Sequence, residues 1–174
     1  MDRKSGILLH ISSLPSPYGI GTLGREAYAF ADFLRAAGQR YWQLLPLGPT
    51  SYGDSPYQSF STFAGNPYFI DLEMLAEDGL LDPADLEQAD WGDDPRYVDY
   101  GKIYASRFQV LRKAFQKGYP RDREAVEAFR SANPWLDNYA LYMAVKSSFG
   151  MKSWLEWPDE DIRLRRSGAV ERCR

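Results

Sequence analysis

The chain has 174 residues, of which 44% are hydrophobic and 26% charged, so we expect a folded domain with a sizeable core rather than a disordered chain. No apolar run approaches the ~20 residues of a membrane span, and a formal charge of −3 indicates neither nucleic-acid nor membrane-surface binding. The chain has a single cysteine, Cys173, which excludes a disulfide framework and a cysteine metal site. It has a single histidine, His10, which excludes any site that needs two imidazoles. We therefore expect no metal and a reducing compartment, most simply the cytoplasm.

The composition changes along the chain. Residues 1–70 contain 14 of the 25 glycines and prolines but 9 of the 45 charged residues. We place a domain boundary near Asp71, between a loop-rich part (1–70) and a charged, mainly helical part (71–174).

The first part predicts a strand, a helix and a second strand. The apolar run 7–10 is the first strand, and apolar residues at helical spacing follow from Leu23 to Leu34, with Gly38 as the expected stop. The second apolar run is 41–45. Continuous apolar strands joined by a crossover helix favour a parallel sheet buried on both faces, which gives one βαβ unit.

The second part predicts helices. One apolar stripe runs from Tyr100 to Phe115 and another from Trp135 to Phe149, with charged residues on the opposite faces. Asn133-Pro134 provides the expected cap and first position of the later helix. We interpret this part as a helical subdomain packed beside the sheet.

Binding groups in βα folds cluster at the C-terminal ends of the strands, which here are residues 10–15 and 46–68. The window 41–68 has seven aromatic residues in 28, interleaved with short polar side chains. Flat rings and hydroxyl-sized polar groups suit the apolar faces and the hydroxyl equator of a sugar. An irregular loop whose aromatic residues fill the core beneath it would have the same composition.

Two further motifs are weaker. Gly19, Gly21 and Gly24 have the spacing of a dinucleotide-binding turn. Nine residues with two prolines separate them from the first strand, so we interpret the match as coincidental. The residues Ser12-Ser13 lack the turn that surrounds a nucleophilic serine. His10, at a strand end, is either a ligand contact or a histidine bonded to the backbone.

Four longer segments of the first part form a more specific pattern. They read Gly6-Ile-Leu-Leu-His-Ile-Ser-Ser-Leu-Pro15, Arg40-Tyr-Trp-Gln-Leu-Leu-Pro-Leu-Gly-Pro-Thr50, Tyr52-Gly-Asp-Ser-Pro-Tyr-Gln-Ser-Phe60 and Phe63-Ala-Gly-Asn-Pro-Tyr68. They resemble the N-terminal signature of amylomaltases, the 4-α-glucanotransferases (disproportionating enzymes) of glycoside hydrolase family 77. The similarity continues through residues 98–101 and 135–144.

The resemblance implies an α/β fold that is the N-terminal part of a TIM (β/α)₈ barrel with a largely helical inserted subdomain. It implies transfer of a segment of an α-1,4-glucan to the 4-hydroxyl of glucose or another glucan, by retaining chemistry through a covalent glycosyl-enzyme. No cofactor is expected. The expected partners are α-1,4-glucans such as maltooligosaccharides and chains derived from starch or glycogen.

By the same resemblance, the catalytic carboxylates lie on later barrel strands. The Arg-x-Asp context of the nucleophile occurs nowhere in the 174 residues, and a whole barrel needs ~250 residues. We therefore expect an N-terminal fragment, truncated at its C-terminus, that is inactive alone and has no catalytic residue. A non-catalytic α-glucan-binding module is the alternative.

The resemblance also assigns substrate-binding positions. Ser55 and Tyr57 are expected to contact the glucan, with Tyr57 stacking under or hydrogen-bonding to a donor-side glucose. Asp54, Gln58 and Asn66 are expected to hold the loop in shape or to contact a sugar hydroxyl. His10 is expected to support the barrel mouth. Tyr52 and Tyr100 match positions of a second glucan site.

Overall fold

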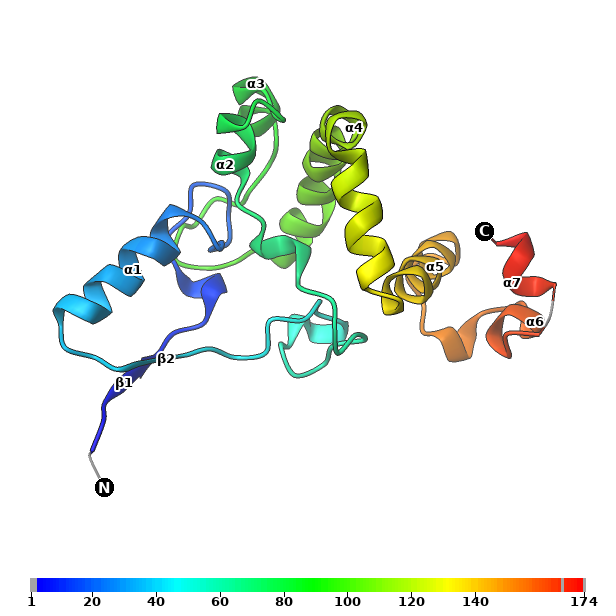
Figure 1. Ribbon diagram of the computed structural model, residues 1–174, viewed down its shortest axis with the longest axis horizontal. Helices are drawn as coiled ribbons and strands as arrows, with labels where there is room; N and C mark the ends of the chain where they lie inside the picture. The colour runs from blue at the N-terminus through cyan, green and yellow to red at the C-terminus, as the bar shows by residue number, and fades with distance from the viewer. Residues whose placement is uncertain (1–2, 167, 174) are drawn as a thin grey trace. The chain divides into compact units, whose positions relative to one another are not determined.

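The computed structural model describes residues 3–166 and 168–173. The chain divides into two compact units, Met1–Arg123 and Glu124–Arg174. The N-terminal unit contains both strands of the described residues, and the elements of the C-terminal unit are helical (Figure 1).

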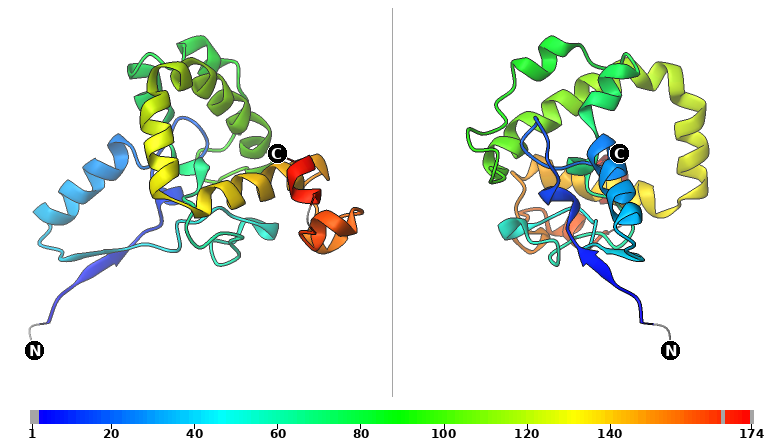
Figure 2. Two further views of the ribbon diagram at one scale, coloured as in Figure 1. Left: turned by 45° about the vertical axis from the view of Figure 1, so that its right-hand side comes forward. Right: turned by 90° about the vertical axis from the view of Figure 1, so that its left-hand side faces the viewer.

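Two short parallel strands lie side by side in the N-terminal unit (Figures 1 and 2). In the register of β1 (Gly6–Leu8) and β2 (Tyr41–Gln43), Gly6 lies opposite Tyr41 and Leu8 opposite Gln43, and helix α1 (Arg25–Ala36) connects the strands. The predicted βαβ order and parallel pairing are confirmed. Both strands are shorter than predicted. After β1 the chain soon turns into the 3₁₀ helix η1 (Ile11–Ser13).

Helix α1 ends where the sequence indicates. Gly38 adopts a left-handed conformation with φ +70°, which costs glycine little because it has no Cβ. The next N–H, that of Gln39, donates to the carbonyl of Leu34 at 2.9 Å. This reversal satisfies a carbonyl of the last turn and directs the chain into β2.

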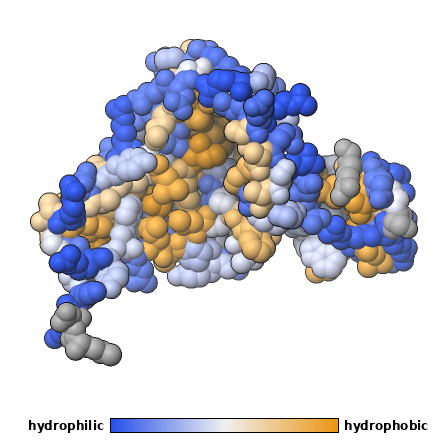
Figure 3. Space-filling model, in the orientation of Figure 1, coloured by the Kyte–Doolittle hydropathy of each residue, from blue (hydrophilic) through white to orange (hydrophobic). Residues whose placement is uncertain are grey.

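The expectation that the strands are buried on both faces is wrong for this chain. Ile7 is 40% exposed, Leu8 55% and Tyr41 57%. Trp42 is half-buried and packs against Phe30 of α1, with ring centroids 4.9 Å apart. Helix α1 thus covers part of the two-stranded sheet, and the side chains on the rest of the sheet stay exposed. Figure 3 shows apolar residues reaching the surface of the N-terminal unit.

The predicted helices after residue 71 are present. They are α2 (Leu72–Glu77), α3 (Pro83–Glu87), α4 (Tyr100–Ala132), α5 (Trp135–Ser148), α6 (Glu160–Arg163) and α7 (Ala169–Arg172). Asp71 caps α2 by accepting the N–H of Met74 at 2.9 Å. That the helices form an insertion in a barrel, with a boundary near Asp71, stays a prediction. No helix within the described residues is long and apolar enough to cross a membrane.

The expected start of α5 is off by one residue. Pro134 is the N-cap and Trp135 the first helical residue. The side chain of Asn133 makes two other hydrogen bonds instead. Its amide donates to the carbonyl of Phe129 at 2.8 Å, and its oxygen accepts from Trp135 Nε1 at 3.1 Å.

The core of the N-terminal unit joins residues from both sides of position 71. Its main cluster comprises Ile11, Leu14, Ile20, Ala27, Tyr68, Phe69 and Ile103. A second cluster comprises Leu72, Leu81, Leu86, Val110 and Ala114. The C-terminal unit has its own cluster of Val145, Trp157, Ile162 and Ala169.

Arg107 contradicts the expectation that the charges of α4 face solvent. Its side chain is 0% exposed, and its guanidinium donates to the carbonyls of Tyr18 at 3.5 Å and Ile70 at 2.5 Å. Burial lowers its pKa to about 10, while the charge of Asp71 opposes this shift, so the guanidinium stays charged at neutral pH. Arg107 therefore ties two loop backbones to α4.

We expect Arg107→Met to lower the free energy of unfolding by about 2–4 kcal/mol, because two carbonyls lose their charged donor. Urea unfolding measures the loss. Arg112→Met, at an exposed position of the same helix, is the control and should change stability by less than about 0.5 kcal/mol. Equal effects of the two substitutions would show that the two carbonyl contacts do not stabilise the fold.

Candidate functional site

The loop after β2 encloses an open hollow of about 480 Å³, which we call the loop hollow. It is lined by Pro46, Leu47, Gly48, Pro56, Tyr57, Ser59, Ser61, Thr62, Phe63, Ala64 and Gly65. Two backbone contacts close the loop: an antiparallel bridge between Thr50 and Ser59, and the N–H of Asn66 donating to the carbonyl of Leu47 at 2.8 Å. The loop hollow thus lies in the segment that leaves the C-terminal end of β2.

Like Phe63, which also lines this hollow and is 70% exposed, Tyr57 is an exposed aromatic residue, with 72% of its surface accessible. Its backbone N–H donates to the hydroxyl of Ser55 at 3.3 Å, and the N–H of Gln58 donates to the carbonyl of Ser55 at 3.1 Å. Ser55 therefore shapes the turn that presents Tyr57. The structure brings these three predicted residues together in one short turn.

Asp54 precedes this turn in an unusual backbone conformation. It has φ +53° and follows Gly53 at φ +75°, both within the 3₁₀ segment η2 (Tyr52–Asp54). Aspartate is among the few residues with a side chain that adopt this region readily. Asp54 is partly buried, and this burial raises the pKa of its carboxyl.

The carboxyl of Asp54 lies in the electrostatic range of two tyrosines. Burial, and secondarily the charge of Asp54, raise the pKa of Tyr68 to about 12. The same two causes raise the pKa of Tyr100, although a hydrogen bond with Ser12 acts in the opposite direction. Both phenols therefore keep their protons at neutral pH and can donate hydrogen bonds.

Tyr68 was not among the predicted site residues, although it lies at the centre of these contacts. It belongs to the 3₁₀ segment η3 (Pro67–Phe69) and is 7% exposed. Its ring centroid lies 6.5 Å from that of Tyr100 and 5.7 Å from that of Phe108, both on α4. The preceding Asn66-Pro67 is the sequence signal of the turn that buries it.

Asn66 acts as the cap of this turn. Its Oδ1 accepts the N–H of Tyr68 at 3.0 Å, and its side chain is buried. Of its two predicted roles, the shaping of the loop is the one this hydrogen bond supports. A direct sugar contact of Asn66 stays a prediction.

We expect Asn66→Ala to lower the free energy of unfolding by about 0.5–2 kcal/mol, the usual loss of a capping side chain. Asn66→Asp keeps the accepting oxygen and should recover most of the loss. Thermal unfolding of the two variants beside the unmodified chain measures both effects. If the aspartate variant were no more stable than the alanine variant, the cap would not explain this residue.

His10 follows β1 and precedes η1. Its ring packs edge-to-face with Phe69, with centroids 5.4 Å apart and an interplanar angle of 81°. Within the described residues its Nδ1 atom is buried and has no hydrogen-bond partner. Burial lowers the pKa of the imidazole, so the ring is neutral at pH 7.

Stability should fall as the pH drops below the ordinary histidine value of about 6.5. The folded state resists the proton that the unfolded chain then binds, so protonation favours unfolding. Chemical unfolding of the unmodified chain and of His10→Gln between pH 7 and pH 5 isolates the contribution of His10 as the difference in slope. Parallel slopes would contradict this explanation.

The second glucan site stays a prediction. The side chain of Tyr52 lies outside the described residues, although its backbone belongs to η2. Tyr100 is half-buried at the first position of α4.

Two of the three glycines at dinucleotide-like spacing, Gly21 and Gly24, have other roles. A Cβ on Gly21 would collide with the carbonyl of Ile11, and one on Gly24 would collide with the carboxylate of Asp71. Gly24 is the N-cap of α1, so a carboxylate of the chain already lies beside that helix start. This arrangement opposes a bound phosphate and supports the interpretation of the motif as coincidental.

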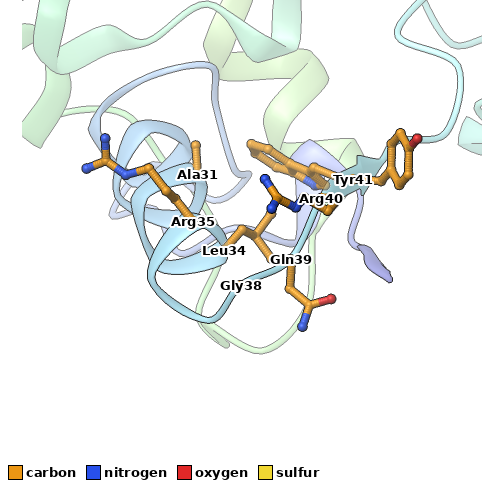
Figure 4. Close-up of a pocket in the computed structure, with 8 residues that line it drawn as sticks. Ala31, Leu34, Arg35, Gly38, Gln39, Arg40 and Tyr41 are labelled. Carbon is orange, nitrogen blue, oxygen red and sulfur yellow. The ribbon is translucent and has the colours of Figure 1, made fainter. Parts of the chain in front are cut away.

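A separate hollow of about 340 Å³ lies at the other end of β2. Figure 4 shows that its residues come from the last two turns of α1, the turn after it and the beginning of β2. It therefore opens near the N-terminal end of β2, away from the predicted ligand edge. Among residues 3–166 and 168–173, no three histidine, cysteine, aspartate or glutamate side chains form a possible metal site.

Comparisons with known proteins agree with the resemblance seen in the motifs. The family model described as 4-alpha-glucanotransferase matches residues 9–174. The 4-alpha-glucanotransferase of Streptococcus pneumoniae strain TIGR4 is 54% identical over 174 residues, which cover 99% of this chain and 34% of the relative. That of Thermus thermophilus is 53% identical over 163 residues, or 91% of this chain and 32% of the relative.

A solved structure has the same fold. An amylomaltase from Streptococcus agalactiae, determined in complex with acarbose, superimposes with a TM-score of 0.95 at 43% identity, over 99% of this chain and 35% of that chain. The chain thus spans about a third of the length of the relatives it matches.

Proposed function

Because this chain belongs to the 4-alpha-glucanotransferase family, we propose that it supplies a glucan-binding part of an enzyme that transfers segments of α-1,4-glucans. The observation that carries the proposal is the exposed ring of Tyr57 beside serine and threonine side chains at the loop hollow. An aromatic ring binds the apolar face of a glucose unit, and the surrounding hydroxyls bind its polar rim.

The substrate is proposed to be an α-1,4-glucan or maltooligosaccharide. The acarbose complex of the similar amylomaltase supports this class of ligand. We propose that Ser55 and Tyr57 contact the glucan, while Asp54, Gln58 and Asn66 hold the loop or contact hydroxyls. The relatives, all named as transferases, favour this function over a non-catalytic binding module. We propose the cytoplasm as the compartment, because a chain with a single cysteine has no disulfide framework that would suit an oxidising compartment.

We propose that β1 and β2 are the first two strands of a (β/α)₈ barrel. Their parallel pairing and the helical crossover support this, as does the similarity to the amylomaltase structure. In a barrel, further strands would cover the apolar side chains that β1 and β2 expose here. Catalysis by a retaining mechanism needs two carboxyl groups about 5–5.5 Å apart. We place these in the two thirds of the relatives that the chain does not span.

A chimera tests the function. This chain would replace the matching 174 residues of the Streptococcus pneumoniae relative, and maltotriose would be the substrate. We expect the chimera to form glucose and longer maltooligosaccharides. Tyr57→Ala should lower kcat/KM by about one to two decades, because a stacking surface and a hydrogen bond are each worth about 0.5–1.5 kcal/mol. Tyr57→Phe should lose the hydrogen-bond share alone.

Tyr28→Ala is the matched control, since Tyr28 is 65% exposed on α1 and does not line the loop hollow. It should leave kcat/KM unchanged. A folded but inactive chimera would refute the proposed function. A lower melting temperature for Tyr57→Ala with normal kinetics would restrict Tyr57 to a structural role.

A further inference from the structure

A hollow of about 490 Å³ lies between two loops of the N-terminal unit, and we call it the two-loop hollow. One wall is formed by segment 12–21, which follows β1, and the other by segment 91–98, which precedes α4. Its volume is within the range of about 300–1,000 Å³ that is usual for ligand pockets. The described residues that line it differ from those of the loop hollow, and Tyr100 of the predicted second glucan site is not among them.

The two walls are held in place by contacts of their own. A Cβ on Gly19 would collide with the carbonyl of Trp91, so a glycine at φ +75° allows the two loops to approach closely. The ring of Trp91 packs edge-to-face against Tyr18, with centroids 5.6 Å apart. Arg107 donates to the carbonyl of Tyr18 at 3.5 Å, and Trp91 Nε1 donates to the carbonyl of Leu86 at 2.8 Å. The hollow is therefore formed before any ligand binds.

The charges at the two-loop hollow neutralise each other. Among the described residues that line it, the charged ones are Asp94 and Arg96. Arg96 Nε donates to Asp94 Oδ1 at 2.9 Å, and Arg96 Nη2 donates to Asp94 Oδ2 at 2.7 Å. These bonds lower the pKa of the Asp94 carboxyl, so both groups are charged at neutral pH. A guanidinium has more N–H donors, and a carboxylate more lone pairs, than these two bonds use.

An exposed ring and serine hydroxyls add the remaining binding groups. Tyr97 is 74% exposed, and the guanidinium carbon of Arg96 lies 5.8 Å from its ring centroid. The other wall contributes Ser13 and Ser16. The hydroxyl oxygen of Ser16 accepts the N–H of Tyr18 at 3.1 Å, so its own O–H can still donate. The hollow thus combines one flat apolar surface with several donors and acceptors.

We infer that the two-loop hollow binds one pyranose unit of a neutral oligosaccharide, as a site separate from the loop hollow. The ring of Tyr97 lies against an apolar face of the sugar, and the Asp94–Arg96 pair bonds two neighbouring hydroxyls. An apolar ligand would desolvate the ion pair without replacing its bonds to water. An anion would find the guanidinium already paired and the carboxylate repulsive. Because the two hollows have different lining residues, this inference does not depend on the proposed function.

Backbone amide NMR of the full chain labelled with ¹⁵N tests the site, with maltotriose as the added sugar. We expect the amide signals of Ser13 and Gly92 to shift along saturable curves. Inorganic phosphate at the same concentration should leave both signals in place. A saturable shift with phosphate, or none with maltotriose, would overturn the inference.

Two substitutions test the binding groups. Tyr97→Ala should weaken maltotriose binding at these signals about three- to tenfold, the effect of one aromatic contact. Arg96→Lys keeps the charge but lacks the planar fork, and should weaken binding about threefold. Both side chains are largely exposed, so the fold should persist. Tyr28→Ala, on α1, is the control and should change the affinity less than about twofold. Unchanged affinity in either test variant would contradict the inference.

The amide signals of Ser59 and Gly65, which line the loop hollow, distinguish the two sites. Tyr57→Ala should weaken binding at these signals and not at Ser13. If maltotriose shifts the loop-hollow signals alone, the inference fails and the proposed function stands. If it shifts Ser13 and Gly92 alone, the inference stands and the glucan contact of Tyr57 is refuted.

Discussion

The parallel pairing of β1 with β2 is the constraint on which the proposed site depends. Because the strands run in one direction, the segments that follow them leave the sheet at the same edge. His10 follows β1, and the loop of Tyr57 follows β2. Residues almost 50 positions apart in the sequence thus emerge at one edge of the sheet, and the crossover through α1 makes this possible. An antiparallel hairpin would have sent them to opposite ends.

The loop itself divides its side chains into two groups. Asn66 and Tyr68 are buried: Asn66 caps the turn through its side-chain oxygen, and the ring of Tyr68 packs in the core. Tyr57, in contrast, is exposed to solvent. Asp54 lies between the two groups, with a raised pKa and an electrostatic effect on two phenols. Such a division suits a recognition loop, because the exposed ring can bind a ligand without loss of the interactions that keep the loop in shape.

The elements that depend on short-range patterns could be predicted from the sequence. The apolar spacing and the glycine at position 38 indicate α1 and its end, and the apolar runs indicate both strands. Arg107 could not be predicted, since an arginine in a helical pattern indicates a solvated face, and the two carbonyls that it serves come from distant loops. The short strands, the burial of Tyr68 and the left-handed backbone of Asp54 likewise depend on tertiary contacts. The family motifs indicated Ser55, Tyr57 and Gln58 as neighbours, but not the enclosure of His10 Nδ1.

Arg107 also has a consequence for how this fold can vary during evolution. Its guanidinium recognises main-chain oxygens of Tyr18 and Ile70, and every amino acid carries that oxygen. Side chains at these two positions can therefore change without loss of the contact, so no compensating change at position 107 is required. A pair of residues joined in this way leaves no covariation between aligned sequences. Methods that infer contacts from coupled substitutions would then miss a contact that joins both loops to α4.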